Sequence, residues 1–231
     1  MTVEIWSDIM CPFCYIGKRR FEAGLARFPE RDKVNIIWRS FQLDPGLKTD
    51  PSMSVNQMLA RKKGWSVEQA AMMNARVTGM AREAGLDYHL DKAVVANSLD
   101  AHRFSHLAAK HGVQDQAEEA LFQAYFTEGK NTADHEVLAA IGVRLGIDRQ
   151  ETLDMLASDA YTDAVEQDIA RAQQIGVQGV PFFVVDNRYA VSGAQESETF
   201  AGALQAAWDA RGPLNTVGTD ENSCGPDGCA A

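Results

Sequence analysis

The sequence predicts an α/β protein in which a large helical insertion separates two sheet-forming ends. Three observations predict this class. A β-α-β pattern fills residues 1–41, helical patterns run from about residue 45 to 158, and an α-β-β-α pattern follows. The chain has 231 residues, of which 45% are hydrophobic and 23% are charged, and this is an ordinary globular composition. The length suits one large domain or a domain with a sizeable insertion.

The N-terminal unit starts with a strand at residues 3–7. We expect a helix to begin at the Cys-Pro-Phe-Cys sequence of residues 11–14, because proline in a first helical turn removes only an N–H that would have no partner there. Apolar residues then recur at the spacing of a buried helix stripe: Phe21, Leu25 and Phe28. The β-branched and aromatic run at residues 34–41 predicts a second strand.

The middle of the chain predicts an insertion built from helices. Ser66 with Gln69 has the pattern of a capping box, and Asp148 with Glu151 has a looser version of it. Methionines cluster in this region and could form either core or an adaptable apolar surface: Met53, Met58, Met72, Met73 and Met80. We therefore expect residues 1–44 and 159–212 to form one domain and residues 45–158 to form a helical insertion domain. Residues 213–231 are polar and turn-rich, which predicts a flexible tail.

The C-terminal unit predicts a helix, a hairpin and a last helix. The first helix has an apolar face formed by Tyr161, Val165, Ile169 and Ala172. Residues 177–185 predict a strand, and a turn at 186–188 leads into its partner at 189–191. Ser197 is placed to cap the last helix. Together with the N-terminal unit, this order of elements is that of a thioredoxin fold with a helical insertion.

The four cysteines form two close pairs, Cys11 with Cys14 and Cys224 with Cys229. Thiol–disulfide chemistry needs one thiolate that attacks and a second sulfur that resolves the mixed disulfide. At a helix N-terminus the dipole and the unpaired N–H groups favour a thiolate at Cys11, and Cys14 lies one turn deeper on the same face. Cys11 is therefore the predicted nucleophile and Cys14 the resolving residue. Two buried cysteines or half of a zinc site are the alternatives.

Val180-Pro181 is a candidate substrate-binding element. An X-Pro bond can be cis, in which case it would expose a backbone edge able to pair with a substrate strand beside the cysteines. An ordinary trans proline at the start of a strand is the alternative. Asp8, three residues before Cys11, is predicted either to cap the helix or to transfer a proton.

Cys224 and Cys229 flank a Gly-Pro-Asp-Gly sequence that is typical of a tight turn. Such a turn would bring the two sulfurs within disulfide distance. We expect an accessory redox pair that relays electrons to or from Cys11; a self-contained disulfide and zinc binding are the alternatives. His102 and His106 share a helix face but lack the Glu of an HExxH motif, so packed histidines are favoured over metal ligands. No metal or other cofactor is predicted.

Three blocks of sequence carry a family resemblance. They are Ser7-Asp8-x-x-Cys11-Pro12-Phe13-Cys14, Asn97-Ser98-Leu99-Asp100-Ala101-His102-Arg103, and Gly176-Val177-x-Gly179-Val180-Pro181-Phe182-Phe183 through Ser192-Gly193-Ala194-Gln195. In these blocks, and over about residues 3–210, the chain resembles the DsbA family and in particular its cytoplasmic FrnE-like branch. The resemblance implies a thioredoxin fold with a helical insertion, a dithiol–disulfide oxidoreductase or isomerase activity, and a cis bond at Val180-Pro181. It also implies that Asn97, His102 and Arg103 face the active-site cleft.

Two comparisons within this resemblance refine the expectation. Strongly oxidising DsbA proteins resemble this chain except for a His where Phe13 stands. A phenyl ring cannot donate a hydrogen bond to a thiolate, so the sequence predicts a milder oxidant. Kappa-class glutathione transferases and 2-hydroxychromene-2-carboxylate isomerases belong to the same superfamily, but they typically carry Ser at the position of Cys11. The two cysteines therefore argue against that glutathione chemistry.

The predicted function is that of a cytoplasmic protein dithiol–disulfide oxidoreductase or isomerase. Its expected partners are protein dithiols and disulfides, with thioredoxin or glutathione as candidate electron partners. A glutathione-dependent small-molecule isomerase or transferase and a non-catalytic zinc module are the alternatives. The net charge of −10 disfavours nucleic acid as a partner. No run approaches the roughly 18 apolar residues of a membrane span, and the N-terminus lacks the pattern of a signal peptide.

Overall fold

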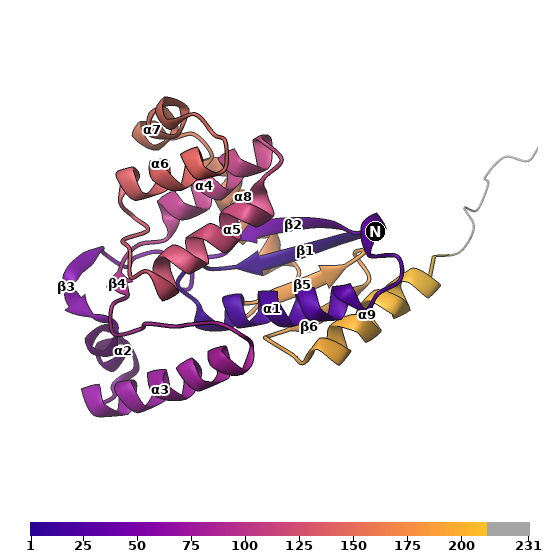
Figure 1. Ribbon diagram of the computed structural model, residues 1–231, viewed down its shortest axis with the longest axis horizontal. Helices are drawn as coiled ribbons and strands as arrows, with labels where there is room; N and C mark the ends of the chain where they lie inside the picture. Colours follow the sequence, from indigo (N-terminus) through magenta and orange to yellow (C-terminus); the bar gives the residue numbers. More distant parts are fainter. Residues whose placement is uncertain (212–231) are drawn as a thin grey trace, which may run out of the picture.

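Residues 1–211 are described by the computed structural model, in which helices cover both faces of a central sheet (Figure 1). The four strands of the sheet are β1 (Thr2–Ser7), β2 (Asn35–Ser40), β5 (Phe182–Val185) and β6 (Tyr189–Ser192), in the order β2-β1-β5-β6. β1 runs parallel to β2 and antiparallel to β5. Strands from distant parts of the chain therefore meet in one sheet, as the predicted order of elements requires.

Two helices, α1 (Pro12–Ala26) and α9 (Ser197–Asp209), cover one face of the sheet. Gly24 permits their close approach, because a Cβ atom at this position would lie 2.6 Å from the carbonyl oxygen of Ser197. The rings of Phe21, Phe183 and Phe200 fill the space between these helices and the sheet. On the other face lies α8 (Thr162–Gln174), where Trp6 Nε1 donates to the carbonyl oxygen of Asp168 at 2.9 Å.

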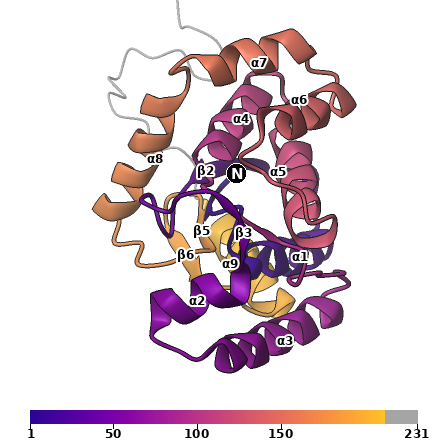
Figure 2. The ribbon, with the colours of Figure 1, turned by 90° about the vertical axis from the view of Figure 1, so that its left-hand side faces the viewer.

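The insertion contributes six α-helices. They are α2 (Val55–Lys63), α3 (Val67–Glu83), α4 (Leu99–Lys110), α5 (Gln114–Phe122), α6 (His135–Arg144) and α7 (Arg149–Ala157). The predicted capping box of Ser66 and Gln69 is present at the start of α3, and Asp148 caps α7. A π-helical turn, Gln123–Thr127, continues α5, and a short 3₁₀ turn, Arg31–Lys33, precedes β2. The two helix groups α2–α3 and α4–α7 lie on either side of the N-terminal end of α1 (Figure 2).

One short pair of strands interrupts the predicted helices of the insertion. β3 (Asp50–Ser54) pairs antiparallel with β4 (Val94–Val95). The sequence did not predict this pair, because β4 has only two residues and β3 is a polar segment that contains Pro51. Neither segment has the run of β-branched residues from which a strand is predicted. The division into a domain at 1–44 and 159–212 and an insertion at 45–158 stays a prediction.

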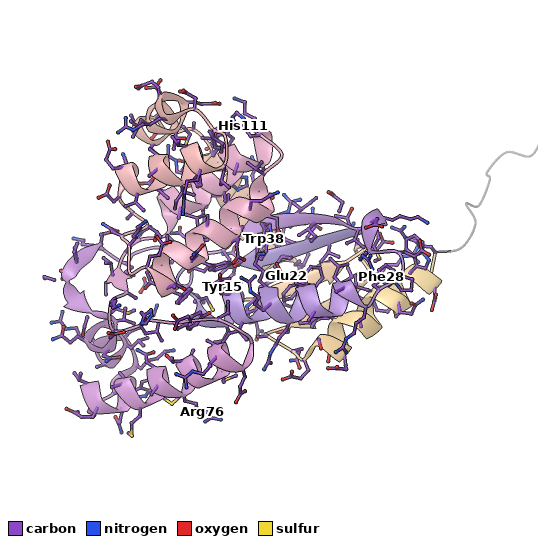
Figure 3. The ribbon with its side chains drawn as sticks, viewed as in Figure 1. Tyr15, Glu22, Phe28, Trp38, Arg76 and His111 are labelled. Atoms are coloured by element: carbon purple, nitrogen blue, oxygen red, sulfur yellow. The ribbon has the colours of Figure 1, made fainter. Side chains whose placement is uncertain are left out.

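A cluster of charges around the buried Lys18 joins α1 to α5. The side chain of Lys18 is only 3% exposed and lies 3.1 Å from Glu119 and 3.6 Å from Asp115, and it also pairs with Glu22. Tyr15 stacks on Phe122 of α5, with 5.0 Å between the ring centroids. Figure 3 shows Tyr15 near the N-terminal end of α1 and Glu22 farther along it. These contacts hold the insertion against the helix that carries both N-terminal cysteines.

The C-terminal unit differs from its prediction in two details. The strand expected at 177–185 begins only at Phe182, because Val177 still donates to Ala172 at the end of α8 and Pro181 has no N–H to offer a neighbouring strand. Ser197 is the first residue of α9, and its predicted capping role is wrong because Glu196 occupies the N-cap position. The tail predicted at 213–231 lies outside the described residues. No helix within residues 1–211 is long and apolar enough to cross a membrane.

Candidate active site

Cys11 and Cys14 lie at the start of α1, the helix that follows β1 in the chain, as predicted. Cys11 is the N-cap residue of α1, and no side chain provides a capping hydrogen bond there. Both residues are free thiols, Cys11 4% and Cys14 1% exposed. The Cys14 N–H donates to the carbonyl oxygen of Cys11 at 3.0 Å. The helix N-terminus therefore presents its positive end to the more exposed of the two sulfurs.

The predicted partner of the cysteines, Val180-Pro181, lies beside Cys11 although it is 169 residues away in the chain. The Val180-Pro181 bond is cis, as the resemblance implied. The carbonyl oxygen of Val180 accepts a hydrogen bond from Cys11 Sγ at 3.5 Å. Pro181 packs on α1 at Gly17, where a Cβ atom would lie only 2.8 Å from Pro181 Cγ. Gly17 therefore sets how closely this backbone edge approaches the cysteines.

Cys14 differs from Cys11 in its surroundings. Burial raises the pKa of the Cys14 thiol well above its usual range, and the neighbouring Cys11 sulfur raises it further. The polar groups of the preceding segment, at Ser7 and Asp8, act in the opposite direction on this pKa. A buried thiol of this kind is suited to a second, intramolecular step rather than to the first attack on a substrate.

Asp8 does not cap α1, so this half of its prediction is wrong. Its carboxylate accepts from the backbone N–H groups of Leu43 at 2.7 Å and Met10 at 3.3 Å, and it lies 3.7 Å from His102 Nε2. Burial alone would raise the pKa of Asp8, but the nearby His102 and the hydrogen bond from the Leu43 N–H lower it. Burial alone would lower the pKa of His102, and Asp8 raises it. The two side chains form a buried ion pair that connects α4 to the cysteine loop, the segment from Asp8 to Cys11 between β1 and α1. A proton-transfer role for Asp8 stays a prediction.

The other residues implied by resemblance support the fold rather than the sulfurs. The Arg103 guanidinium donates to the carbonyl oxygens of Met155, Ser158 and Ala160 and caps the end of α7. The Asn97 side-chain amide donates to the carbonyl oxygens of Pro45 and Leu47. His106 faces Asp168 and Ser40 and not His102. Within residues 1–211, no three or more His, Cys, Asp or Glu side chains are grouped as metal ligands would be.

An apolar groove of about 280 Å³ opens beside Cys11, and sequence reasoning did not locate it. Its walls come from the cysteine loop, from α2 and α3, and from the π-helical turn after α5: Met10, Phe13, Met58, Trp65, Met73 and Phe126 are among the lining residues. Among the residues that line the groove, all of which lie in the described part of the chain, Lys63 is the one charged residue. Phe13 and Trp65 are each 38% exposed at the rim. In the sequence, the cluster of methionines and Trp65 was the one feature that could have indicated this groove.

The comparisons with known proteins agree with this geometry. The family model of the DsbA-like thioredoxin domain matches residues 2–205 of the chain. The chain belongs to the DsbA-like thioredoxin domain family. The narrower assignment to the FrnE-like branch stays a prediction.

Several solved structures are similar to the structure of this chain. A probable DsbA oxidoreductase from Streptomyces coelicolor is 43% identical with a TM-score of 0.89, and the match covers 100% of this chain and 99% of that one. A 2-hydroxychromene-2-carboxylate isomerase is 17% identical with a TM-score of 0.63. The cytosolic disulfide reductase DsbM from Pseudomonas aeruginosa, solved with glutathione, is 15% identical with a TM-score of 0.60. Each of these two matches covers 90% of this chain and 95% of the other, and at such identities the likeness is one of fold.

Cys224 and Cys229 lie outside the described residues, so their proposed link to Cys11 is not tested by the geometry. The described site contains the Cys11–Cys14 dithiol, the Val180 carbonyl and the apolar groove. A dithiol beside a backbone carbonyl is chemically able to exchange disulfides.

Proposed function

We propose that this DsbA-like protein is a protein dithiol–disulfide oxidoreductase or isomerase. The observation that carries the proposal is the position of Cys11 Sγ, 3.5 Å from the Val180 carbonyl oxygen and at the wall of the groove. The Cys11 thiolate attacks a substrate disulfide R–S–S–R′, forms a bond to one sulfur and releases R′–S⁻. Cys14 then attacks Cys11 Sγ, which closes the Cys11–Cys14 disulfide and releases the second substrate thiol. Two electrons pass from the dithiol to the substrate, and the reverse sequence oxidises a substrate dithiol.

The groove supports a polypeptide substrate. Exposed apolar side chains around a reactive thiol favour apolar segments, and methionines adapt to different side-chain shapes. The backbone at Val180 is positioned to pair with an extended substrate chain, which needs no particular side chain. Glutathione carries two carboxylates and an ammonium group, whereas Lys63 is the one charged group that lines the groove. Apolar walls and a backbone edge thus favour unfolded or extended protein over a small charged thiol.

A glutathione-dependent isomerase or transferase is the second candidate, because the fold is shared with a 2-hydroxychromene-2-carboxylate isomerase. The two candidates differ in their need for Cys14, since transfer of glutathione to a small molecule has no resolving step. Insulin reduction and glutathione conjugation of 1-chloro-2,4-dinitrobenzene separate them. We expect the wild-type protein to reduce insulin, Cys11→Ser to be inactive, and Cys14→Ser to accumulate as a mixed disulfide. Conjugation without insulin reduction, unchanged in Cys14→Ser, would refute the proposal.

We also propose that the protein works in the cytoplasm as a mild oxidant or reductant, with thioredoxin or glutathione as the electron partner. Phe13 supports the mild potential, because its ring offers no hydrogen bond to the Cys11 thiolate. The equilibrium of the Cys11–Cys14 couple with reduced and oxidised glutathione measures this potential. A couple as oxidising as DsbA, about −120 mV, would contradict the proposal.

The second cysteine pair is proposed as an electron relay to Cys11. The contact between Phe28 and Trp208 brings the end of α9 to the end of α1, about 25 Å from Cys11 at 1.5 Å per helical residue. The 13 residues from Arg211 to Cys224 can span roughly 40 Å when extended, so the chain is long enough for Cys224 to reach Cys11. Replacing Cys224 and Cys229 by Ser is expected to slow turnover with a thiol reductant. Unchanged turnover would contradict the relay.

A further inference from the structure

A tyrosine from the helical insertion contacts the dipeptide between the two cysteines. The hydroxyl of Tyr88, in the segment between α3 and β4, donates to the carbonyl oxygen of Pro12 at 2.7 Å, across 76 positions of the chain. Pro12 is the first residue of α1, and a helical carbonyl oxygen accepts from the N–H four residues on. Because that oxygen has a second lone pair, the bond from Tyr88 is an addition that the helix itself does not need.

Packing fixes the Tyr88 ring in this position. Tyr88 is 4% exposed, and its ring stacks on Phe126 with 4.5 Å between the ring centroids and on Tyr15 with 6.1 Å. Burial raises the pKa of Tyr88, and negative charge on the Cys11 and Cys14 sulfurs raises it further. The hydroxyl therefore stays protonated and remains a donor. A donor that is in place before the sulfurs react acts without rearrangement.

The peptide group that Tyr88 contacts also carries a donor for Cys11. The Pro12 carbonyl and the Phe13 N–H belong to one peptide group. Phe13 is the second residue of α1 and Cys11 is the N-cap residue, and an N-cap side chain ordinarily accepts from the N–H of the second or third helical residue. Among residues 1–211, the Phe13 N–H donates to no backbone oxygen. It is therefore available to a Cys11 thiolate.

The two hydrogen bonds of this peptide group strengthen one another. A hydrogen bond to the Pro12 carbonyl oxygen draws electron density from the amide, so the Phe13 N–H becomes a stronger donor. Bonds linked in this way strengthen by about 10–30% each. The bond from Phe13 to the Cys11 thiolate forms only while Cys11 is reduced. Because stabilisation of the reduced protein makes a dithiol couple more oxidising, the Tyr88 hydroxyl should favour reduction of the Cys11–Cys14 disulfide.

We propose that Tyr88 is a positioning residue that makes the Cys11–Cys14 couple more oxidising, acting through the Pro12–Phe13 peptide group. The inference rests on the proposed function. The hydroxyl takes no part in the exchange of sulfur bonds and keeps its proton. It changes the equilibrium between dithiol and disulfide, so that the segment between α3 and β4 tunes a couple whose cysteines lie on α1.

The test is the equilibrium of the full-length protein with reduced and oxidised glutathione at pH 7. Cys224 and Cys229 are first replaced by Ser, so that Cys11 and Cys14 are the two remaining thiols. One glutathione disulfide oxidises the dithiol, which forms the Cys11–Cys14 disulfide and releases two glutathione thiols. Alkylation followed by mass spectrometry gives the ratio of oxidised to reduced protein in this parent and in Tyr88→Phe.

Tyr15→Phe is the matched control. The Tyr15 ring belongs to the same aromatic stack, but its hydroxyl donates to Glu119 at 2.6 Å and not to the Pro12 carbonyl. Both variants keep the ring and lose one hydroxyl, so packing changes little in either. Only Tyr88→Phe alters the peptide group at Pro12. Urea unfolding of each reduced variant compares their stability and verifies that both are folded.

We expect Tyr88→Phe to raise the equilibrium constant for oxidation by glutathione disulfide about two- to fivefold, as the loss of 10–30% of a hydrogen bond to a charged group predicts. The first alkylation of the reduced dithiol by iodoacetamide at pH 7 should slow by a similar factor, because the thiolate is the nucleophile. Tyr15→Phe should leave both values unchanged.

Three results would overturn the inference about Tyr88. They are an equilibrium constant in Tyr88→Phe equal to that of the parent, a lower one, and an equal rise in Tyr15→Phe. The last result would show that packing of the aromatic stack, and not the bond to Pro12, sets the equilibrium. If the parent protein itself forms no Cys11–Cys14 disulfide with glutathione, the proposed dithiol function fails instead, so the two failures are distinguishable.

Discussion

The ion pairs of Glu119 predict how the stability of this protein depends on pH. The Glu119 carboxylate accepts from Tyr15 at 2.6 Å and Arg19 at 2.8 Å, and it lies 3.1 Å from Lys18 Nζ. Burial alone would raise the pKa of Glu119, but these partners lower it to about 2 from an ordinary value of 4.5. Because the pKa is lower in the folded protein, the stabilisation is fully present above pH 4.5. It is lost as the pH falls toward 2.

The size of this contribution follows from the two pKa values. The difference between 4.5 and 2 corresponds to roughly 3 kcal/mol, at about 1.4 kcal/mol for each pKa unit. The Glu119 side chain is 31% exposed, so screening by solvent reduces the figure, and we expect about 1–2 kcal/mol. Glu119→Gln should therefore lower the free energy of unfolding by that amount at pH 7. The difference between variant and wild type should shrink steadily between pH 4.5 and pH 2.

Urea unfolding followed by tryptophan fluorescence measures this difference at each pH. The matched control is Glu136→Gln, because Glu136 pairs with Arg149 at an exposed site on α6 and such pairs contribute little. A Glu119→Gln variant as stable as wild type at pH 7 would refute the reasoning. So would a loss of equal size at pH 7 and pH 2.5, since a loss independent of pH cannot come from the charge of Glu119.

Three further predictions concern the site and its support. Gly17→Ala should slow insulin reduction several-fold, because its Cβ would lie 2.8 Å from Pro181 Cγ. Gly202→Ala should leave the rate unchanged, because a Cβ atom there meets nothing within 4 Å. Equal rates of insulin reduction in the two variants would contradict the role of Gly17. Trp65→Ser should raise KM for apolar peptide disulfides but not for a small disulfide, whereas the exposed Val143→Ser on α6 should change neither; an unchanged KM would exclude the groove as the binding surface. Arg103→Met should lower the free energy of unfolding by about 1–3 kcal/mol, because buried carbonyl oxygens lose their donor, and an unchanged free energy in urea unfolding would contradict this.

Local sequence patterns predicted much of the sheet-containing part. The stripe of Phe21, Leu25 and Phe28 lies on α1, and the run at 34–41 contains β2. Such elements are predictable because their burial repeats with the period of the helix or strand itself. β3 and β4 were not predicted, since two paired valines and a proline-containing segment form strands only through contact with each other.

The residues around the cysteines were likewise predicted where local sequence defines them and missed where tertiary contacts do. Cys11 and Cys14 were predicted from their place between a strand and a helix. Asp8 was assigned as a cap because it lies three residues before Cys11, but its carboxylate binds Leu43 and His102, which no short spacing connects to it.

The sequence by itself determined the α/β order of elements, the place of the dithiol at a helix start and, through resemblance, the cis bond between Val180 and Pro181. These features rest on residues that are neighbours in the chain or on motifs whose spacing is preserved. Only the tertiary structure decided the rest, namely the groove beside Cys11, the 3.5 Å approach of the Val180 carbonyl oxygen to Cys11 Sγ, and the buried Lys18 cluster. The physical reason is that each of these depends on contacts between segments far apart in the chain, which packing brings together and local periodicity does not encode.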